Sequence, residues 1–196
     1  MSMHIIAGSA RGRRLFMTPT DIMVRPISSR IRQSLFDILK PLVTGSYFLD
    51  LFAGTGAVGL EALSRGAQKA VFVERDARCI KVIERNLAHL AFADRATVLK
   101  GNAVNALTWV LHRTSLEAFD LIFMGPPYRD ERNNPLFFAR QTLEQVSAGG
   151  LLSGHGWAIA QHHQKEEPGA VAGLEMFRRE KYGDSRVSFY RRAAKA

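Results

Sequence analysis

Short apolar runs alternate with helical patterns over most of this chain. Five runs are nearly continuous in apolar residues, at 47–52, 70–74, 96–100, 120–124 and 157–161. Amphipathic patterns with helical spacing lie between them, at 57–65, 76–91, 103–113 and 135–146. Strands that are apolar on both faces and separated by amphipathic helices are typical of a parallel sheet covered by helices on both sides. We therefore predict an α/β fold.

The two ends of the chain depart from that rhythm. The stretch "HIIAGSARGRRLFM" predicts a hairpin of two short strands around a Gly/Ser/Arg turn. The next pattern, "SSRIRQSLFDILKP", predicts a helix that Ser28 or Ser29 caps and that Pro41 ends, with Arg30 and Arg32 on its polar face. The tail "LEMFRREKYGDSRVSFYRR" predicts two strands joined by Tyr-Gly-Asp, the last one antiparallel to the main sheet.

The chain's organisation favours one compact domain with a small extension. We expect the hairpin and first helix, residues 1–40, to precede a main domain of residues 41–196. Its lone cysteine, Cys79, excludes an internal disulfide, and no Cys/His group has metal-ligand spacing. There is no signal-peptide pattern and no apolar run near the roughly 18 residues of a membrane span. We expect a cytoplasmic protein that binds no metal.

Charge indicates the kind of partner. The 196 residues include 27 Lys and Arg against 18 Asp and Glu, a formal net charge of +9. Basic residues gather near both ends while the middle is nearly balanced, which favours a polyanionic partner such as nucleic acid, although solubility alone stays possible. The candidates for phosphate contacts in the N-terminal segment are Arg11, Arg13, Arg14, Arg30 and Arg32.

The stretch "LDLFAGTGAVGLEAL" follows the first strand of the predicted sheet and opens a helix. Gly54 and Gly56 allow a tight turn and a close approach to a ligand. Glu74 ends the next strand, at the interval where an acidic side chain meets ribose hydroxyls in dinucleotide-binding folds. Asp50, however, would repel a pyrophosphate, whereas S-adenosylmethionine carries an ammonium and a sulfonium that favour a carboxylate. The pattern therefore predicts S-adenosylmethionine as the cofactor.

A second motif, Gly125-Pro126-Pro127-Tyr128, ends the strand at 120–124. The prolines fix the backbone and lack N–H groups, so carbonyl oxygens are presented where the chain leaves the sheet. An exocyclic amine on a base is a poor nucleophile, and acceptors that hold its N–H bonds aim it at a methyl donor. Tyr128 can stack on a base. The alternative is an ordinary loop with turn prolines.

Together, "LDLFAGTGAVGLEALSRGA", "FDLIFMGPPY", the N-terminal "IIAGSARGRRL" and "RPISSRIRQSLFDIL", and the C-terminal "KYGDSRVSFY" resemble the bacterial 16S rRNA guanine-2-amino methyltransferases of the small-subunit methyltransferase D type. The resemblance spans almost the whole chain. It implies a class I methyltransferase, Rossmann-like, with a mostly parallel seven-stranded sheet, helices on both faces, an antiparallel last strand and an N-terminal hairpin. It also implies 16S rRNA or the assembling small ribosomal subunit as partner, and we expect a monomer.

The resemblance assigns roles residue by residue. Asp50, Ala53, Gly54 and Gly56 would form the methionine-side wall of the cofactor site, Glu74 would hold the ribose, and Asn102, often Asp in the family, would meet the adenine beside Ala103. Phe52 and Arg75 are further cofactor-binding candidates. Catalysis would involve Gly125, Pro126, Pro127 and Tyr128.

This sequence departs from the family's pattern at two places. Gly125 stands where the family carries Asp or Asn, and Ile27 with Ser28 or Ser29 replaces Thr and Asp. Gly125 offers no side-chain acceptor, so either a neighbour such as Asp130 substitutes, or turnover is weak or lost while binding persists, or the change is a local variant. The functional alternatives are a DNA or protein amino methyltransferase, and a cofactor-binding RNA assembly factor.

Overall fold

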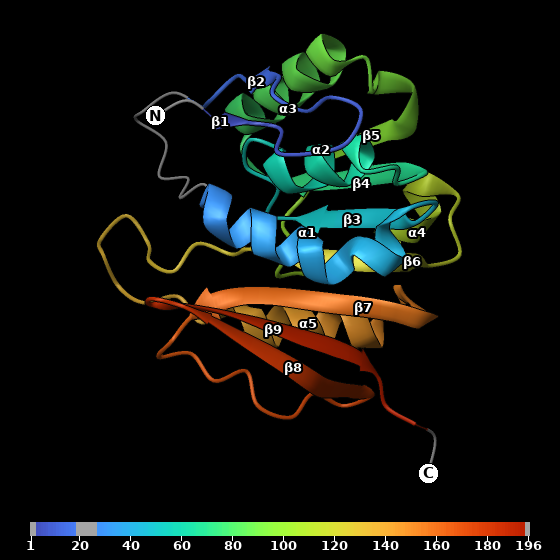
Figure 1. Ribbon diagram of the computed structural model, residues 1–196. Helices are drawn as coiled ribbons and strands as arrows, with labels where there is room; N and C mark the ends of the chain where they lie inside the picture. The colour runs from blue at the N-terminus through green and yellow to red at the C-terminus, as the bar shows by residue number, and fades with distance from the viewer. Residues whose placement is uncertain (1–2, 19–26, 195–196) are drawn as a thin grey trace.

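The computed structural model describes residues 3–18 and 27–194. Its centre is a seven-stranded sheet with the order β5-β4-β3-β6-β7-β9-β8 (Figure 1). The strands are β3 (Tyr47–Leu51), β4 (Lys69–Glu74), β5 (Ala96–Lys100), β6 (Phe119–Met124), β7 (Leu152–His163), β8 (Leu174–Tyr182) and β9 (Ser185–Arg192). The strand order reverses between β3 and β6, which is where ligands bind in sheets of this type.

The strand directions confirm the predicted fold class. β3 to β7 pair in parallel, while β9 pairs antiparallel with both β7 and β8. The predicted N-terminal hairpin is also present, as a separate two-stranded sheet of β1 (Met3–His4) and β2 (Arg14–Leu15).

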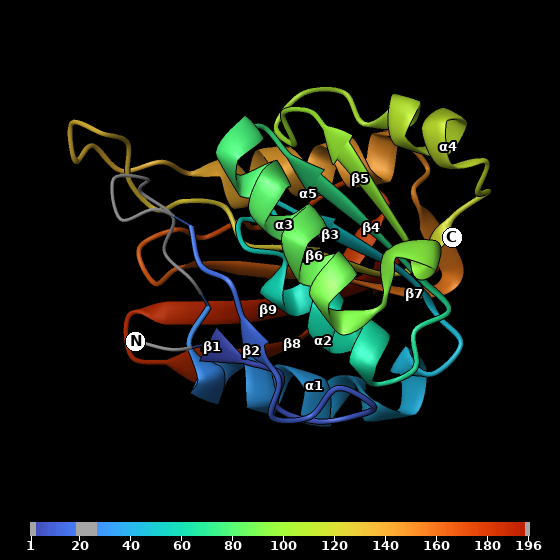
Figure 2. The same ribbon diagram turned by 90° about the horizontal axis from the view of Figure 1, so that it is seen from above.

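Helices cover both faces of the sheet, as Figure 2 shows. One face carries α1 (Ser29–Val43), α2 (Ala57–Ser64) and α3 (Ala77–Leu90), and the other carries α4 (Thr108–Thr114) and α5 (Phe138–Ala148). A 3-10 turn, η1 (Ala93–Arg95), leads from α3 into β5. No helix in the described ranges is long and apolar enough to cross a membrane.

Several predicted helix boundaries were wrong; α5, for example, spans Phe138–Ala148 instead of 135–146. Pro41 lies inside α1, which continues to Val43. Pro41 has no N–H group, so the carbonyl of Asp37 has no helical donor; Asp37 is exposed, and water can replace the lost bond. The continuation of the helix by two residues places Val43 in the core. α4 begins at Thr108 instead of 103, because Asn102 first forms a turn: its side-chain oxygen accepts from Val104 N–H, and its carbonyl accepts from Asn105 N–H.

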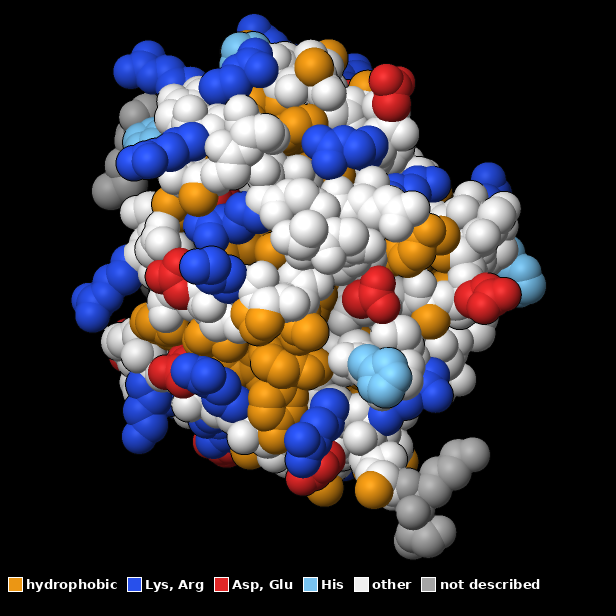
Figure 3. All heavy atoms as spheres, turned by 45° about the vertical axis from the view of Figure 1, so that its right-hand side comes forward, with side chains coloured by type: hydrophobic (Ala, Val, Ile, Leu, Met, Phe, Trp, Pro, Cys, Tyr) orange, Lys and Arg blue, Asp and Glu red, His pale blue; other side chains and the backbone are white. Residues whose placement is uncertain are grey.

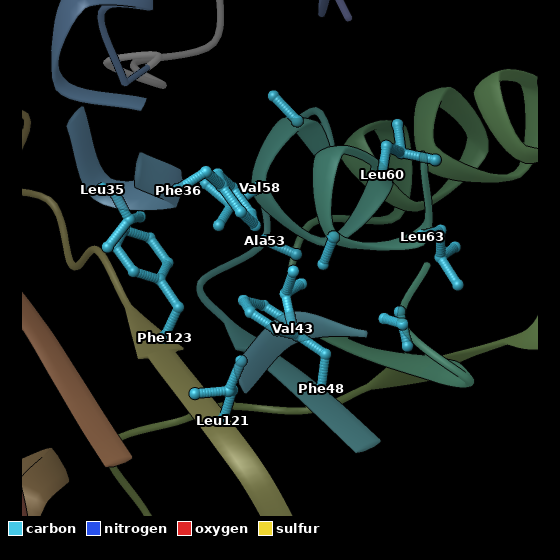
Figure 4. Packing of buried hydrophobic residues seen from close by; sticks show 14 of the residues in the cluster. Leu35, Phe36, Val43, Phe48, Ala53, Val58, Leu60, Leu63, Leu121 and Phe123 are labelled. Carbon is cyan, nitrogen blue, oxygen red and sulfur yellow. The ribbon is translucent and has the colours of Figure 1, made fainter. Parts of the chain in front are cut away.

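The core consists of two apolar clusters, one on each face of the sheet. In the first, Phe36 of α1 stacks on Phe48 of β3 with ring centroids 6.3 Å apart, and Figure 4 shows these side chains with Val58 of α2 close by. The same cluster includes Ile5 and Leu15 from the hairpin segment. This cluster contains residues from both sides of the expected boundary at residue 40. The division into segments 1–40 and 41–196 therefore remains a proposal, based on the different functions that we expect of the two segments.

Beyond α1, the same face of β7, β9 and β8 carries aromatic side chains. Trp157 packs edge-on against Phe177, with ring centroids 4.8 Å apart, and both are only partly buried. In Figure 3 a hydrophobic area lies at the level of these strands, with basic and acidic side chains distributed around it. Among the described residues in this view, the basic side chains do not form one uninterrupted patch.

Candidate cofactor and substrate site

A cavity of about 590 Å³ lies at the carboxyl ends of the central strands. These ends are on the left of Figure 1, where the loop between β6 and α5 projects. The cavity brings together residues that the sequence predicted from four separate segments. They are Asp50, Phe52, Ala53, Gly54, Glu74, Arg75, Asn102, Ala103, Gly125, Pro126, Pro127 and Tyr128.

Three alternate residues of the Gly loop after β3 have left-handed backbone. Phe52, Gly54 and Gly56 have φ values of 61°, 56° and 78°. Left-handed backbone favours glycine, so Phe52 adopts a conformation that is uncommon for a large side chain, and it does so beside the cavity. Gly56 was predicted to contact the cofactor, but it does not line the cavity. Its φ instead lets the chain enter α2, and a Cβ there would press on Ile83 at 3.2 Å.

Asp50 is a buried carboxyl group in the cavity wall. Its Oδ2 atom accepts a hydrogen bond of 2.9 Å from Gly59 N–H in the first turn of α2. The pKa of Asp50 is raised to about 8: burial is the main cause, the Gly59 bond opposes it, and the charge of Glu74 adds to it. A cation placed beside Asp50 would favour the ionised carboxylate.

Glu74 connects the end of β4 to the Gly loop. Its Oε2 atom accepts from Gly54 N–H at 2.8 Å, and its Oε1 atom accepts from the N–H groups of Arg75 at 2.8 Å and Asp76 at 3.0 Å. A carboxylate has about four acceptor positions, so capacity remains for a hydroxyl donor. Glu74 is 9% exposed, and it lines the cavity. It is held rigidly where the prediction places a ribose.

The Pro-Pro-Tyr segment is attached to both neighbouring strands. Gly125 N–H donates to the Leu51 carbonyl of β3 at 3.4 Å. The Tyr128 hydroxyl donates to Ser185 Oγ at 3.1 Å and accepts from Gln161 Nε2 at 3.1 Å. The ring also meets His163 edge-on at 5.7 Å. Tyr128 is therefore held against β7 and β9 at the edge of the cavity.

Asp130 was one candidate to replace the acceptor that Gly125 lacks. It lines the cavity, but its carboxylate accepts from Arg132 N–H and from both the backbone and side-chain N–H groups of Asn134. These bonds lower the pKa of Asp130, and the bond from the Asn134 side chain has the largest effect. The three bonds hold the carboxylate in the turn of its own loop.

Four of the predicted phosphate-binding arginines are exposed: Arg11, Arg13, Arg14 and Arg30. Arg11 and Arg30 border one shallow groove between the hairpin and α1. Arg13 donates to the His89 carbonyl, which directs its side chain toward the end of α3.

The prediction for Arg32 was wrong. This residue is 1% exposed, donates to the His4 carbonyl at 2.6 Å and lies 3.8 Å from the Glu61 carboxylate. Burial lowers its pKa despite the attraction of Glu61. Arg32 is on the inward stripe of α1 with Phe36, four residues on, and cannot reach a phosphate at the surface.

Three of the basic residues near the C-terminus are paired with acidic side chains. Ion pairs join Arg178 to Glu180, Arg179 to Glu167 and Arg191 to Glu175. Their net field is therefore weaker than the sequence clustering indicated.

Comparison with known proteins identifies the family. The family described as Conserved hypothetical protein 95 matches residues 3–191. The putative rRNA methyltransferase YlbH of Bacillus subtilis is 34% identical over 191 residues, covering 97% of this chain and 99% of that protein. The ribosomal RNA small subunit methyltransferase D of Escherichia coli K12 is 36% identical over 154 residues, 79% of this chain and 68% of that protein.

The chain belongs to the family described as Conserved hypothetical protein 95.

Solved structures agree with the assignment. The putative methyltransferase yhhF of Escherichia coli superposes with a TM-score of 0.79 at 28% identity, covering 100% of both chains. The protein TTHA0928 of Thermus thermophilus gives a TM-score of 0.76 at 30% identity, covering 95% of this chain and 98% of that one. The predicted resemblance to the small-subunit methyltransferase D family is confirmed. The roles of single residues remain predictions.

Proposed function

We propose that this protein transfers a methyl group from S-adenosylmethionine to the exocyclic 2-amino group of a guanine in 16S rRNA. One observation carries the proposal: a single cavity is lined by Asp50 and the Gly loop after β3, by Glu74 at the end of β4, and by the Pro-Pro-Tyr segment after β6. The relatives named as rRNA methyltransferases support an RNA substrate.

The cavity residues suit S-adenosylmethionine, which would supply a methyl group activated on a sulfonium. Asp50 is a buried carboxyl group whose pKa is raised by burial. The positive charges of the methionine moiety would stabilise its ionised form and lower that pKa. Glu74 has acceptor capacity for ribose hydroxyls, and Asn102 can hydrogen-bond the edge of an adenine. A dinucleotide is disfavoured because its pyrophosphate would meet Asp50 beside the Gly loop.

The Pro-Pro-Tyr segment would position the target base. Carbonyl oxygens next to Pro126 hold an N–H of the amine and direct its lone pair toward the methyl donor. The amine nitrogen would form the bond to the methyl carbon, the sulfonium sulfur would keep the electron pair of the bond that breaks, and one amine proton would pass to water. Tyr128, fixed by Ser185 and Gln161, offers a ring face on which a base can stack.

The exposed arginines of the hairpin and α1 would hold the RNA backbone. Arg11 and Arg30 border the same groove, so a phosphate between them would meet two cations. In this proposal the N-terminal segment contacts the RNA and the sheet carries the chemistry.

Mass mapping of methylated nucleosides in 16S rRNA tests the function. Cells with and without this protein are compared, and the purified protein is then supplied with labelled S-adenosylmethionine and small-subunit particles. The proposal expects one 2-methylguanosine that disappears without the protein and returns in vitro. An unchanged nucleoside map would contradict it.

A second candidate is an RNA assembly factor that binds the cofactor without turnover. Gly125 favours it, because the position offers no side-chain acceptor for the amine. This candidate expects S-adenosylmethionine binding, RNA binding and no transfer of label. The in vitro reaction therefore separates the two.

A further inference from the structure

Gln161 lies beside the Pro-Pro-Tyr segment, on the strand next to β6. The last paired residues of β6 and β7 are Met124 and Ala160, so Gln161 comes one position further, next to Gly125. It is half-buried and lines the cavity. No motif marks it in the sequence, because only the register of two distant strands brings it there.

The side chain of Gln161 reaches toward the space that a side chain at position 125 would enter. A Cβ atom built on Gly125 would lie 3.9 Å from Oε1 of Gln161. In the family, an Asp or Asn at this position would extend from that Cβ. An acceptor oxygen is therefore present close to where the missing one would be, but it comes from β7.

The hydrogen bonds around Tyr128 fix which end of the amide faces the cavity. The Tyr128 hydroxyl directs its only proton to Ser185 Oγ, so toward Gln161 it acts as an acceptor. Nε2 of Gln161 must then face Tyr128, and Oε1 points away from it. Within the described part of the chain, no donor hydrogen-bonds to Oε1. This leaves the oxygen available to a ligand.

We propose that Oε1 of Gln161 accepts one N–H of the target amine and supplies the acceptor that Gly125 lacks. The inference rests on the proposed function and names a further residue for it. The amine would be held between Gln161 and a carbonyl next to Pro126, with its lone pair free to form the nitrogen–carbon bond. Asp130 is the weaker candidate because its bonds to Arg132 and Asn134 hold its carboxylate in the turn of its own loop.

Single-turnover methylation of small-subunit particles tests the role of the oxygen. Gln161→Met keeps the length of the side chain but removes the acceptor, and we expect transfer to slow by about a hundredfold, the usual effect of losing one preorganised partner. Cofactor affinity, measured by calorimetry, should stay within twofold. Gln161→Glu is the matched control: it keeps an acceptor oxygen and should retain most of the rate. Gln161→Leu serves as the second variant if the Met form melts early.

Restoring the missing side chain gives a sharper test. The φ of Gly125 lies outside the left-handed region, and the nearest neighbour of a new Cβ is the Phe123 ring, at 3.1 Å, which must shift by a few tenths of an ångström. Gly125→Asp alone should gain little, because Gln161 already acts. Added to Gln161→Met, the same change should recover at least tenfold of the lost rate.

The outcomes separate the inference from the function. If the unmodified protein methylates and Gln161→Met transfers equally fast, Gln161 is not the acceptor, while the proposed function stands. A large gain from Gly125→Asp alone also overturns the inference, because it would mean that no acceptor was present. If the unmodified protein binds S-adenosylmethionine but methylates no particle, the proposed function fails and the inference fails with it.

Discussion

The carboxylate of Glu74 accepts a hydrogen bond of 2.8 Å from the backbone N–H of Gly54. This bond joins the end of β4 to the Gly loop after β3, so the two predicted cofactor contacts form one unit. Replacing Glu74 with Ala should weaken S-adenosylmethionine binding by about 1.5–3 kcal/mol, because charge-assisted contacts to the ribose are lost. Isothermal calorimetry measures the change.

Glu74→Gln is the control for the loop itself. Its amide oxygen can still accept from Gly54 N–H, so the loss of affinity should be smaller than for Glu74→Ala. Equal affinity in the Ala form and the unmodified protein would exclude Glu74 as a cofactor contact.

Arg32 should contribute to stability and not to RNA binding. Its guanidinium is buried beside Glu61, and removing one partner of a buried ion pair costs about 3–5 kcal/mol. Glu61 keeps its bonds to Arg65 and to the N–H groups of Ile6 and Ala7, so Arg32→Met should fall near the lower end of that range. Urea denaturation gives the free energy of unfolding.

The exposed Arg30, two residues earlier on α1, is the matched control. Arg30→Ala should change the free energy of unfolding by about 0.5 kcal/mol or less, as is usual for surface positions. If Arg32→Met were as stable as Arg30→Ala, the buried pair would contribute nothing.

The sequence predicted the sheet well because its strands are apolar on both faces and lie between helices with clear periodicity. It predicted most of the cavity because the Gly loop, Glu74 and the Pro-Pro-Tyr segment all follow strands whose carboxyl ends meet. Gln161 was missed because β6 and β7 are separated by a loop and a helix, and nothing local reveals their register.

The predictions for Arg32 and Pro41 were wrong because each relied on a local property of the residue and did not include its tertiary contacts. Arg32 shares the inward stripe of α1 with Phe36, Leu39 and Val43, but its charge suggested an exposed position. Pro41 is a strong helix breaker in isolation, yet burial of Val43 extends α1 past it. In both cases tertiary contacts outweighed the local preference.

The hairpin arginines should determine how RNA binding depends on salt. Arg11, Arg13 and Arg14 are exposed in the N-terminal segment. Each phosphate contact contributes about 0.7–0.9 to the log–log slope of affinity against salt concentration, so replacing all three with Ala should flatten the slope by up to about 2–3. Filter binding to 16S rRNA fragments at several salt concentrations measures it.

Arg113, exposed at the end of α4 on the opposite face of the sheet, provides the comparison. Arg113→Ala should leave the slope unchanged, and neither variant should alter S-adenosylmethionine affinity. An unaltered slope in the triple variant would mean that the hairpin arginines are only a solvated surface.

Asp50 should make the free protein less stable as pH rises. Its pKa is raised from 3.8 to about 8 in the folded protein, so between these values the native state holds a proton that the unfolded chain has released. When the unfolded state binds fewer protons, the free energy of unfolding falls with increasing pH, by at most about 1.4 kcal/mol per pH unit for one group.

Asp50→Asn keeps an oxygen for the Gly59 N–H and cannot ionise, so the stability of this variant should fall less steeply from pH 5 to 8. Urea denaturation of both forms across this range isolates Asp50 from other groups such as Glu166, whose pKa burial also raises. A constant difference between the two forms would mean that Asp50 is already ionised at pH 5.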